Sequence, residues 1–171
     1  MFSKGANKQN PSLLERKLRD ATDRLIMLDE TCGVGLWVAA LPTSDPAHPD
    51  ATWMWSSEFR RLCGCRTEAE FPNALQSWSD RLHPDDAARV MAHLTDAMQD
   101  RTSKTRIDTT YRLRMPDGGY RWFRAIGGCR HSSDEAGVRA CGSLTDITAQ
   151  GRPWVHPLSM NVSYSMNRVA L

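Results

Sequence analysis

The sequence has no apolar run long enough to cross a membrane. Within its 171 residues, no stretch approaches the roughly 20 apolar residues that a transmembrane helix needs. The first residues also lack the apolar core and the small-residue cleavage site of a secretory signal peptide. We therefore expect a cytoplasmic protein without a membrane partner.

Sequence motifs of the common enzyme classes are also missing. The chain contains no G-x-S-x-G, no P-loop and no H-E-x-x-H, which argues against the corresponding hydrolases and nucleotide-binding enzymes. Its five cysteines are dispersed, and none belongs to a C-x-x-C pair, the usual half of a zinc site. The sequence therefore predicts no catalytic site and no metal centre, and reduced cytosolic thiols are the simpler interpretation.

A strong charge of either sign is absent as well. The 22 basic and 20 acidic side chains leave a net charge of +2, and the basic residues are scattered among the acids. Domains that bind nucleic acid usually concentrate basic residues on one face. We therefore expect no nucleic-acid partner. The apolar fraction of 40% is that of an ordinary soluble domain.

Three segments of different character divide the chain. Residues 1–30 carry an amphipathic pattern that predicts a helix, with a capping box formed by Ser12 and Glu15. Its apolar residues alternate spacings of four and three, as in a coiled-coil seam: Leu14, Leu18, Ala21, Leu25 and Leu28. About two heptads leave open whether this helix pairs with a second copy or packs on its own domain. Residues 31–150 form the body, and residues 151–171, without acidic residues or periodicity, are expected to be poorly ordered.

The pattern of the body predicts an α+β domain. The expected strands span residues 33–41, 51–56, 109–115, 120–129 and 138–148, and the expected helices lie within 57–64, 67–71, 73–82 and 84–100. Ser57 is the expected N-cap of the first helix, and Pro84 with two aspartates suits the first turn of the last one. The glycine pairs at 118–119 and 127–128 are expected in turns or at strand edges. This order of elements favours one antiparallel sheet with helices on one face.

The body also carries an ordered set of short motifs. They are Trp55-Ser56, Phe59 to Leu62 with Gly64, Trp78, His83-Pro84-Asp85-Asp86, Tyr111 to Arg114, Asp117 to Phe123, and Gly142 to Thr148. With these motifs, residues 33–148 resemble a PAS domain of the PAS fold-3 subgroup. The resemblance implies a five-stranded antiparallel sheet with short helices on one face, enclosing a small cavity.

The resemblance also implies a function. PAS domains sense ligands, redox state or cofactors and pass the signal to an output domain, often as dimers. The residues that make up the motifs look most like those of the PAS sensor module of bacterial methyl-accepting chemotaxis proteins. We therefore expect a non-enzymatic sensor module that forms a homodimer, binds a small molecule and contacts signalling proteins. A sensor fragment of a histidine kinase or diguanylate cyclase, or a dimerisation module without a ligand, are the alternatives.

The same resemblance suggests where a ligand would bind. The candidate lining residues are Trp37, Trp55, His93, Leu94, Leu113 and Trp122. Haem could be held by His93 or His83, and a flavin could lie between tryptophans, although such residues more often fill a core. The N-C-R-F-L-Q-type motif of light-sensing flavin domains is missing, which argues against photochemistry. The sequence thus leaves the identity of any cofactor open.

Two residues of the closing motif are candidates for signal relay. Asp146 and Thr148 lie where the last expected strand ends. In the family this point leads into the output helix, and hydrogen bonds there couple strand to helix. The simpler interpretation is a turn that ends the strand. Here Gly151 and Pro153 would break such a helix, so a truncated receptor and a stand-alone module are both possible.

Overall fold

The computed structural model describes part of the N-terminal segment and nearly all of the body. The described residues are Leu13, Arg16, Lys17, Arg24, Leu25, Met27, Asp29 and the ranges 31–131 and 137–150. The predicted N-terminal apolar stripe, apart from Leu25, and the tail 151–171 lie outside the described residues. Among the described residues, no helix is long and apolar enough to cross a membrane.

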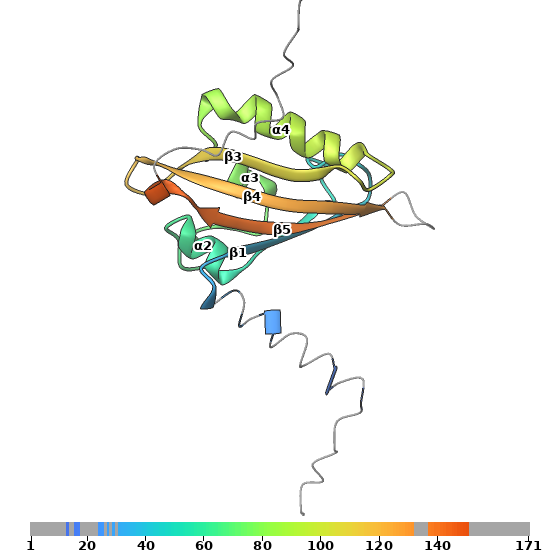
Figure 1. The fold of residues 1–171 in the computed structure, drawn as a ribbon, viewed down its shortest axis with the longest axis horizontal. Coiled ribbons are helices and arrows are strands. Elements are labelled where there is room, and N and C mark those ends of the chain that lie inside the picture. Colours follow the sequence, from blue (N-terminus) through green and yellow to red (C-terminus); the bar gives the residue numbers. More distant parts are fainter. Residues whose placement is uncertain are drawn as a thin grey trace, which may run out of the picture.

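Five strands form one antiparallel sheet (Figure 1). They are β1 (Gly35–Leu41), β2 (Thr52–Trp55), β3 (Arg106–Arg114), β4 (Tyr120–His131) and β5 (Val138–Asp146), in the order β2-β1-β5-β4-β3. The predicted α+β class with one antiparallel sheet is confirmed. The two strands of the N-terminal half thus pair with the three later strands through β1 and β5.

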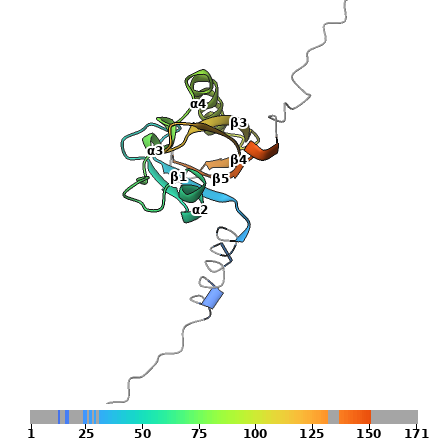
Figure 2. The ribbon, with the colours of Figure 1, turned by 90° about the vertical axis from the view of Figure 1, so that its left-hand side faces the viewer.

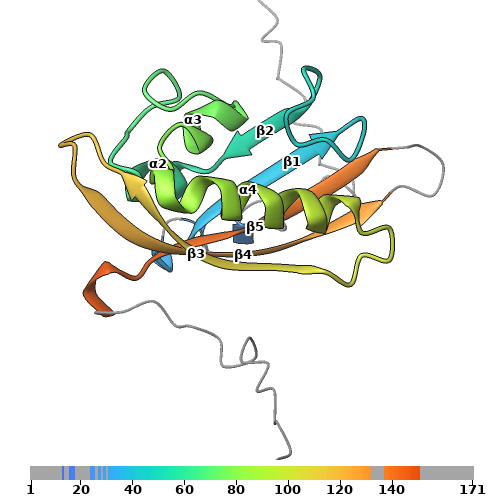
Figure 3. The same ribbon diagram turned by 90° about the horizontal axis from the view of Figure 1, so that it is seen from above.

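The helices lie on one face of this sheet (Figure 3). They are α2 (Ser57–Leu62), α3 (Leu75–Ser79) and α4 (Pro84–Gln99), and a short 3-10 helix, η1 (Thr148–Gln150), follows β5. Seen from the side, the curved sheet and the three α-helices surround a common interior (Figure 2). The core therefore lies between the helices and the inner face of the sheet.

Residue alternation explains which side chains reach that core. In β3, the inner residues Ile107, Thr109, Tyr111 and Leu113 are buried, whereas the residues between them are exposed or half-buried. This period of two is the pattern of a sheet with only one covered face. Helix α4 contributes a complementary apolar stripe that includes Val90, Leu94 and Met98.

Three predicted details are wrong, for identifiable reasons. Residues 67–71, expected to be helical, form only a turn, in which the Phe71 amide donates to the Thr67 carbonyl at 3.1 Å, and Pro72 cannot continue a helix. Helix α2 is capped by Ser56 and not by Ser57: Ser56 has extended backbone, and its hydroxyl accepts a hydrogen bond from the amide of Phe59 at 3.1 Å. The pair Gly127 and Gly128 lies inside β4, not at a turn or strand edge. A Cβ on Gly127 would lie 2.7 Å from the Trp37 ring, so this glycine makes room for a tryptophan.

The segment before the body is anchored to α2 through Asp29. This carboxylate is 6% exposed, and it accepts hydrogen bonds from the Ser57 hydroxyl at 2.9 Å and the Glu58 amide at 3.2 Å. Because both donors belong to the first turn of α2, Asp29 satisfies backbone and side-chain groups that would otherwise lack partners. Sequence reasoning missed this contact between the N-terminal segment and the body.

Candidate functional site

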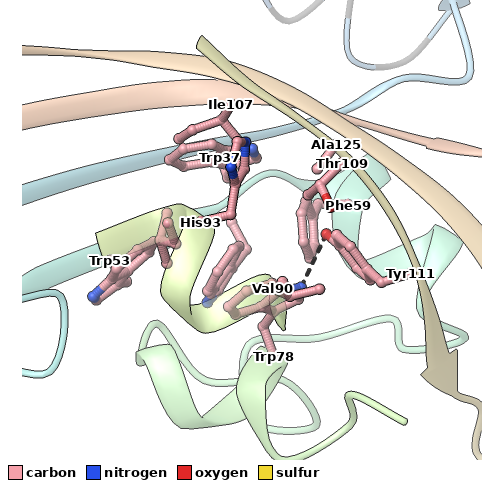
Figure 4. A pocket seen from close by; sticks show the side chains of 12 residues that line it. Trp37, Trp53, Phe59, Trp78, Val90, His93, Ile107, Thr109, Tyr111 and Ala125 are labelled. Carbon is pink, nitrogen blue, oxygen red and sulfur yellow. Dashed lines mark hydrogen bonds between the residues drawn. The ribbon is translucent and has the colours of Figure 1, made fainter. Parts of the chain in front are cut away.

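A cavity lies between the sheet and the helices (Figure 4). Its lining comes from every layer of the domain: Trp37, Trp53, Trp55, Phe59, Trp78, Val90, His93, Leu94, Ile107, Thr109, Tyr111 and Ala125. The space open to the centres of water molecules is about 30 Å³, which corresponds to about two waters. The cavity is therefore small and almost entirely apolar.

Stacked aromatic rings form the wall near the sheet edge. The centroids of Trp37 and Trp53 lie 6.1 Å apart, those of Trp53 and Trp55 lie 5.5 Å apart, and Trp55 is 4.6 Å from Phe59. The indole nitrogens of Trp53 and Trp55 donate to the carbonyls of Pro46 and Ala74, each at 3.3 Å. Their polar atoms are thus satisfied by loop carbonyls, which leaves the ring surfaces for the cavity.

Two of the polar groups around the cavity form a hydrogen bond with each other. The Trp78 indole nitrogen donates to the Tyr111 hydroxyl at 3.1 Å (Figure 4). Burial raises the pKa of Tyr111, so its hydroxyl stays neutral. A third group, the Thr109 hydroxyl, accepts a hydrogen bond from Arg89 at 3.0 Å. These contacts fix the walls and leave these polar groups already partnered.

His93 differs from the other polar groups. Its Nε2 atom is buried and has no hydrogen-bond partner among the described residues. A buried polar atom without a partner costs about 1–3 kcal/mol, and such atoms call for an explanation. Since His93 lines the cavity, a ligand with one hydrogen-bonding group could supply the missing partner there.

The structure brings together four of the six candidate lining residues. Trp37, Trp55, His93 and Leu94 line the cavity. Leu113 is buried on the inner face, but it lies farther along β3, where it bridges to Leu82. Trp122 alternates with the buried Phe123 and therefore lies on the outer side of β4. The β3 residues that do line the cavity were not predicted. The period-two pattern of β3 already indicated that Thr109 and Tyr111 lie on the same face of the strand.

The histidine and aspartates of the H-P-D-D motif lie at the start of α4. The His83 ring accepts a hydrogen bond from the Asp85 amide at 3.2 Å and packs 4.6 Å from the Tyr120 ring. His83 does not line the cavity. Among the described residues, no group of three or more potential metal-ligating side chains comes together. The motif thus begins the helix, as its Pro-Asp-Asp composition indicated.

Asp86 of this motif connects α4 to β3. Its carboxylate accepts hydrogen bonds from the Arg112 side chain at 2.8 Å and from the Arg112 amide at 3.0 Å, and it also contacts Arg89. Burial alone would raise the pKa of Asp86, but the hydrogen bonds from Arg112 outweigh this effect, so the pKa lies below its ordinary value. Asp86 is therefore ionised at neutral pH and holds the first turn of α4 against the sheet.

Arg112 continues this connection to the end of β5. Its guanidinium lies 5.2 Å from the centroid of the Trp122 ring, within the range of a cation–π contact. The Trp122 amide donates to the Thr148 hydroxyl at 3.1 Å, and the Ile147 amide donates to the Trp122 carbonyl at 2.9 Å. A continuous series of contacts therefore runs from α4 through Arg112 and Trp122 to Thr148.

Asp146 completes the structure at this end of the sheet. Its carboxylate accepts a hydrogen bond from the Thr148 amide at 2.8 Å and lies 3.7 Å from the Arg121 guanidinium. Both Asp146 and Thr148 thus tie the end of β5 to β4, close to the last described residue. This geometry suits either a turn that ends the strand or a relay to a following segment.

A haem or flavin does not fit the cavity as it stands. Pockets for ligands of that size measure roughly 300–1,000 Å³, whereas this cavity offers about 30 Å³. His93 is the one histidine in the lining, so an axial ligand could come only from it. The volume of the cavity therefore suits neither cofactor.

Comparison with known proteins decides the family. A model of the PAS fold matches residues 52–143, which is more than half of the chain. The chain belongs to the PAS family. The match includes β2, the three helices, β3, β4 and most of β5, so the lining of the cavity, apart from Trp37, lies within the matched region.

Solved PAS structures share this fold. A sensory box histidine kinase/response regulator from Burkholderia thailandensis is 26% identical, with a TM-score of 0.57, over 74% of this chain and 86% of that chain. The N-terminal domain of a diguanylate cyclase from Marinobacter aquaeolei is 16% identical, with a TM-score of 0.52, over 68% of this chain and 99% of that chain. The second likeness is evidence of fold alone.

A curated relative is considerably longer than this PAS chain. An uncharacterized protein of Pseudomonas chlororaphis is 35% identical over 77 residues, which is 44% of this chain and 30% of that protein. This chain thus matches less than a third of that relative's length.

Proposed function

We propose that this PAS domain is a non-enzymatic sensor that binds a small ligand in the aromatic cavity and relays its presence to the end of β5. The observation that carries the proposal is the buried Nε2 atom of His93, which has no partner among the described residues and lies in the cavity lining. An apolar cavity with one available polar group is the usual chemistry of a small-molecule site.

The cavity defines the class of ligand. Its volume of about 30 Å³ admits only a molecule of a few atoms unless α4 moves away from the sheet. Its aromatic lining favours an apolar body, and His93 favours one hydrogen-bonding group. The ligand is therefore a very small, weakly polar molecule, or a somewhat larger one that enters by displacing α4.

The relay follows from the position of α4. This helix supplies Val90, His93 and Leu94 to the cavity, and its first turn holds Arg112 through Asp86. A ligand that favours a different position of α4 would shift the Arg112–Trp122–Thr148 contacts by selecting one of two arrangements. Binding at the cavity would thereby alter the segment that follows β5, with no reaction at the site.

The larger protein in which this sensor works is a separate part of the proposal. The motifs favour the PAS module of a chemotaxis receptor, acting in the cytoplasm as a homodimer. The 26% identity to the Burkholderia sensory box histidine kinase/response regulator favours a histidine kinase as the second candidate. In either context the PAS domain controls an output domain that contacts other signalling proteins.

Ligand entry can be tested with xenon, an apolar probe, followed by the indole resonances in the NMR spectrum of the ¹⁵N-labelled chain. We expect saturable shifts of the indole signals of Trp37, Trp53 and Trp78. Ala125→Leu, which fills the cavity, should abolish the shifts, whereas Ile126→Leu on the opposite face should leave them unchanged. Shifts that never saturate, or that survive Ala125→Leu, would refute the proposed site.

A visible absorbance spectrum provides a second arm of this test. Protein produced in haem- and flavin-replete cells should show neither a Soret band nor flavin bands, because neither cofactor fits the cavity. A band that disappears on His93→Leu would show that the cavity expands to hold a cofactor, and the small-ligand proposal would then be wrong.

A further inference from the structure

A second concave site lies on the outer face of the sheet, away from the aromatic cavity. It is a solvent-open groove of about 720 Å³, lined by residues at the C-terminal end of β4 and the N-terminal end of β5; these strand ends lie at the right of Figure 1. Side chains that line it and alternate outward include Val38, Arg106, Arg130, Arg139 and Cys141, with Gly128 between them. The groove falls in the size range of small-molecule sites.

The strand register gathers three arginines around this groove. Arg130 of β4 pairs directly with Arg139 of β5, and Arg106 of β3 pairs with Gly128, two residues before Arg130. Directly paired residues have Cα atoms about 5 Å apart. Two like charges in such a pair repel each other and destabilise the sheet. The fold thus keeps a cationic arrangement that has a cost in stability.

The three arginines are absent from the ion pairs found among the described residues. Asp108, two residues along β3 from Arg106, forms a bidentate pair with Arg124 at 2.8 and 2.7 Å. Among the described residues the groove thus holds three arginines outside any ion pair, whereas other arginines of the domain frequently bind carboxylates.

Gly128 leaves the floor of the groove open. A Cβ atom at this position would meet nothing within 4 Å, whereas one at the neighbouring Gly127 would strike the Trp37 ring and a backbone carbonyl. Packing therefore explains Gly127 but not Gly128. The absence of a side chain at Gly128 keeps free the space that lies between the three arginines.

We propose that this groove binds a small molecule that carries phosphate groups. Guanidinium groups recognise phosphate through paired N–H donors in a planar fork, and three of them suit an anion with more than one negative charge. The exposed Val38 and the thiol of Cys141 border the cationic part and would contact the organic portion. The domain would then bind two ligands, one on each face of its sheet.

Isothermal titration with pyrophosphate tests the phosphate part of this proposal. In a buffer of constant ionic strength, we expect saturable binding with a Kd below about 1 mM. Arg130→Gln combined with Arg139→Gln should weaken binding on the order of a hundredfold, because charge-assisted hydrogen bonds are lost. The matched control, Arg66→Gln with Arg114→Gln, removes the same charge from exposed positions outside the groove and should change binding less than about twofold.

Gly128→Leu separates a built site from general attraction between charges. It leaves every arginine in place and has free space for its side chain, so the domain should fold while pyrophosphate binding falls at least about tenfold. The proposal is wrong if pyrophosphate does not saturate, if the control pair weakens binding equally, or if Gly128→Leu has no effect. It is also wrong if the Arg130/Arg139 variant loses a dimer and not an anion, since the face would then be a subunit interface.

Discussion

The two faces of the sheet differ in almost every property, although alternate residues of the same strands build them. The inner face borders an aromatic cavity of about 30 Å³, and the outer face borders an open cationic groove of about 720 Å³. Cys129 and Ala140 are buried, whereas their neighbours Arg130 and Arg139 are exposed. Because successive side chains point to opposite faces, one strand pair can carry two unrelated chemistries.

Neighbouring glycines show this contrast most sharply. Gly127 and its partner Gly142 lie beneath the Trp37 ring, and a Cβ on either would come within 2.7 Å of that ring. Gly128, the next residue, has open space above it. Glycine at position 127 therefore makes room for Trp37 on the inner face, whereas glycine at position 128 leaves the outer groove open.

Gly142→Val should have the largest effect on this comparison. A Cβ at this position would lie 2.3 Å from the Ile126 carbonyl oxygen and 2.7 Å from Trp37, so strand and ring must both move. Overpacking of this kind typically costs about 1–3 kcal/mol, and contact with backbone raises the cost, so we expect a loss of about 3 kcal/mol or more. Urea denaturation followed by tryptophan fluorescence measures it.

Gly128→Val is the matched control for this substitution. It should change the free energy of unfolding by less than about 1 kcal/mol, because the new side chain meets no atom and valine suits a strand. Equal destabilisation by the two variants would show that the faces do not differ in the way described.

Asp86→Asn should have the next largest effect, about 2 kcal/mol at neutral pH. The buried carboxylate binds Arg112, and its lowered pKa means that the native state favours its ionised form. Stability from such a group is present above the ordinary aspartate pKa of about 3.9 and is lost as the pH falls through the lower native value. The difference between wild type and variant should therefore shrink below about pH 4 in urea titrations.

Asp85→Asn serves as the control for Asp86, since the Asp85 side chain is 74% exposed. Its effect should stay within about 0.5 kcal/mol across the same pH range. If Asp85→Asn costs as much as Asp86→Asn, the buried contact with Arg112 is not what holds α4 to the sheet.

The smallest expected difference between the two faces is the reactivity of their cysteine thiols. Cys32 and Cys141 are exposed, whereas Cys63, Cys65 and Cys129 are buried. Burial raises the pKa of Cys63 to about 12 and that of Cys129 to about 11, and a protonated thiol is a poor nucleophile.

With a disulfide reagent at mildly alkaline pH, the two exposed thiols should react in the folded protein and all five in urea. Cys141→Ser should remove one of the two fast-reacting thiols. Rapid reaction at Cys129 in the folded state would contradict the assignment of this residue to the closed face.

Much of the fold could be predicted from the sequence because its signals are local. The alternation in β3, the Pro-Asp-Asp start of α4 and the turn at Pro116 each depend on adjacent residues. The predictions failed where a residue distant in sequence determines the structure. Gly127 resembles a strand-edge glycine until Trp37 of another strand is packed against it. Ser56, and not Ser57, is the cap because its backbone is extended and its amide donates to the Leu36 carbonyl of β1 at 2.9 Å.

The candidate site was predictable to a similar extent. Trp37, Trp55, His93 and Leu94 line the cavity, whereas Trp122 lies on the other side of its strand and takes part in the contacts with Thr148. Its alternation with Phe123 could have placed it there. The arginine groove was not predicted, because the pairing of Arg130 with Arg139 and the position of Arg106 beside them depend on the exact strand register.

The central claim is that the state of the cavity reaches the end of β5 through Arg112 and Trp122. The most direct measurement compares the Trp122 indole and Thr148 amide resonances in wild type, His93→Phe, Arg112→Met and the double variant. The account predicts that His93→Phe shifts both resonances and that the same change has little effect once Arg112 is replaced, giving a clear coupling in the double-mutant cycle. Unchanged Trp122 and Thr148 resonances in His93→Phe, while cavity resonances shift, would contradict it.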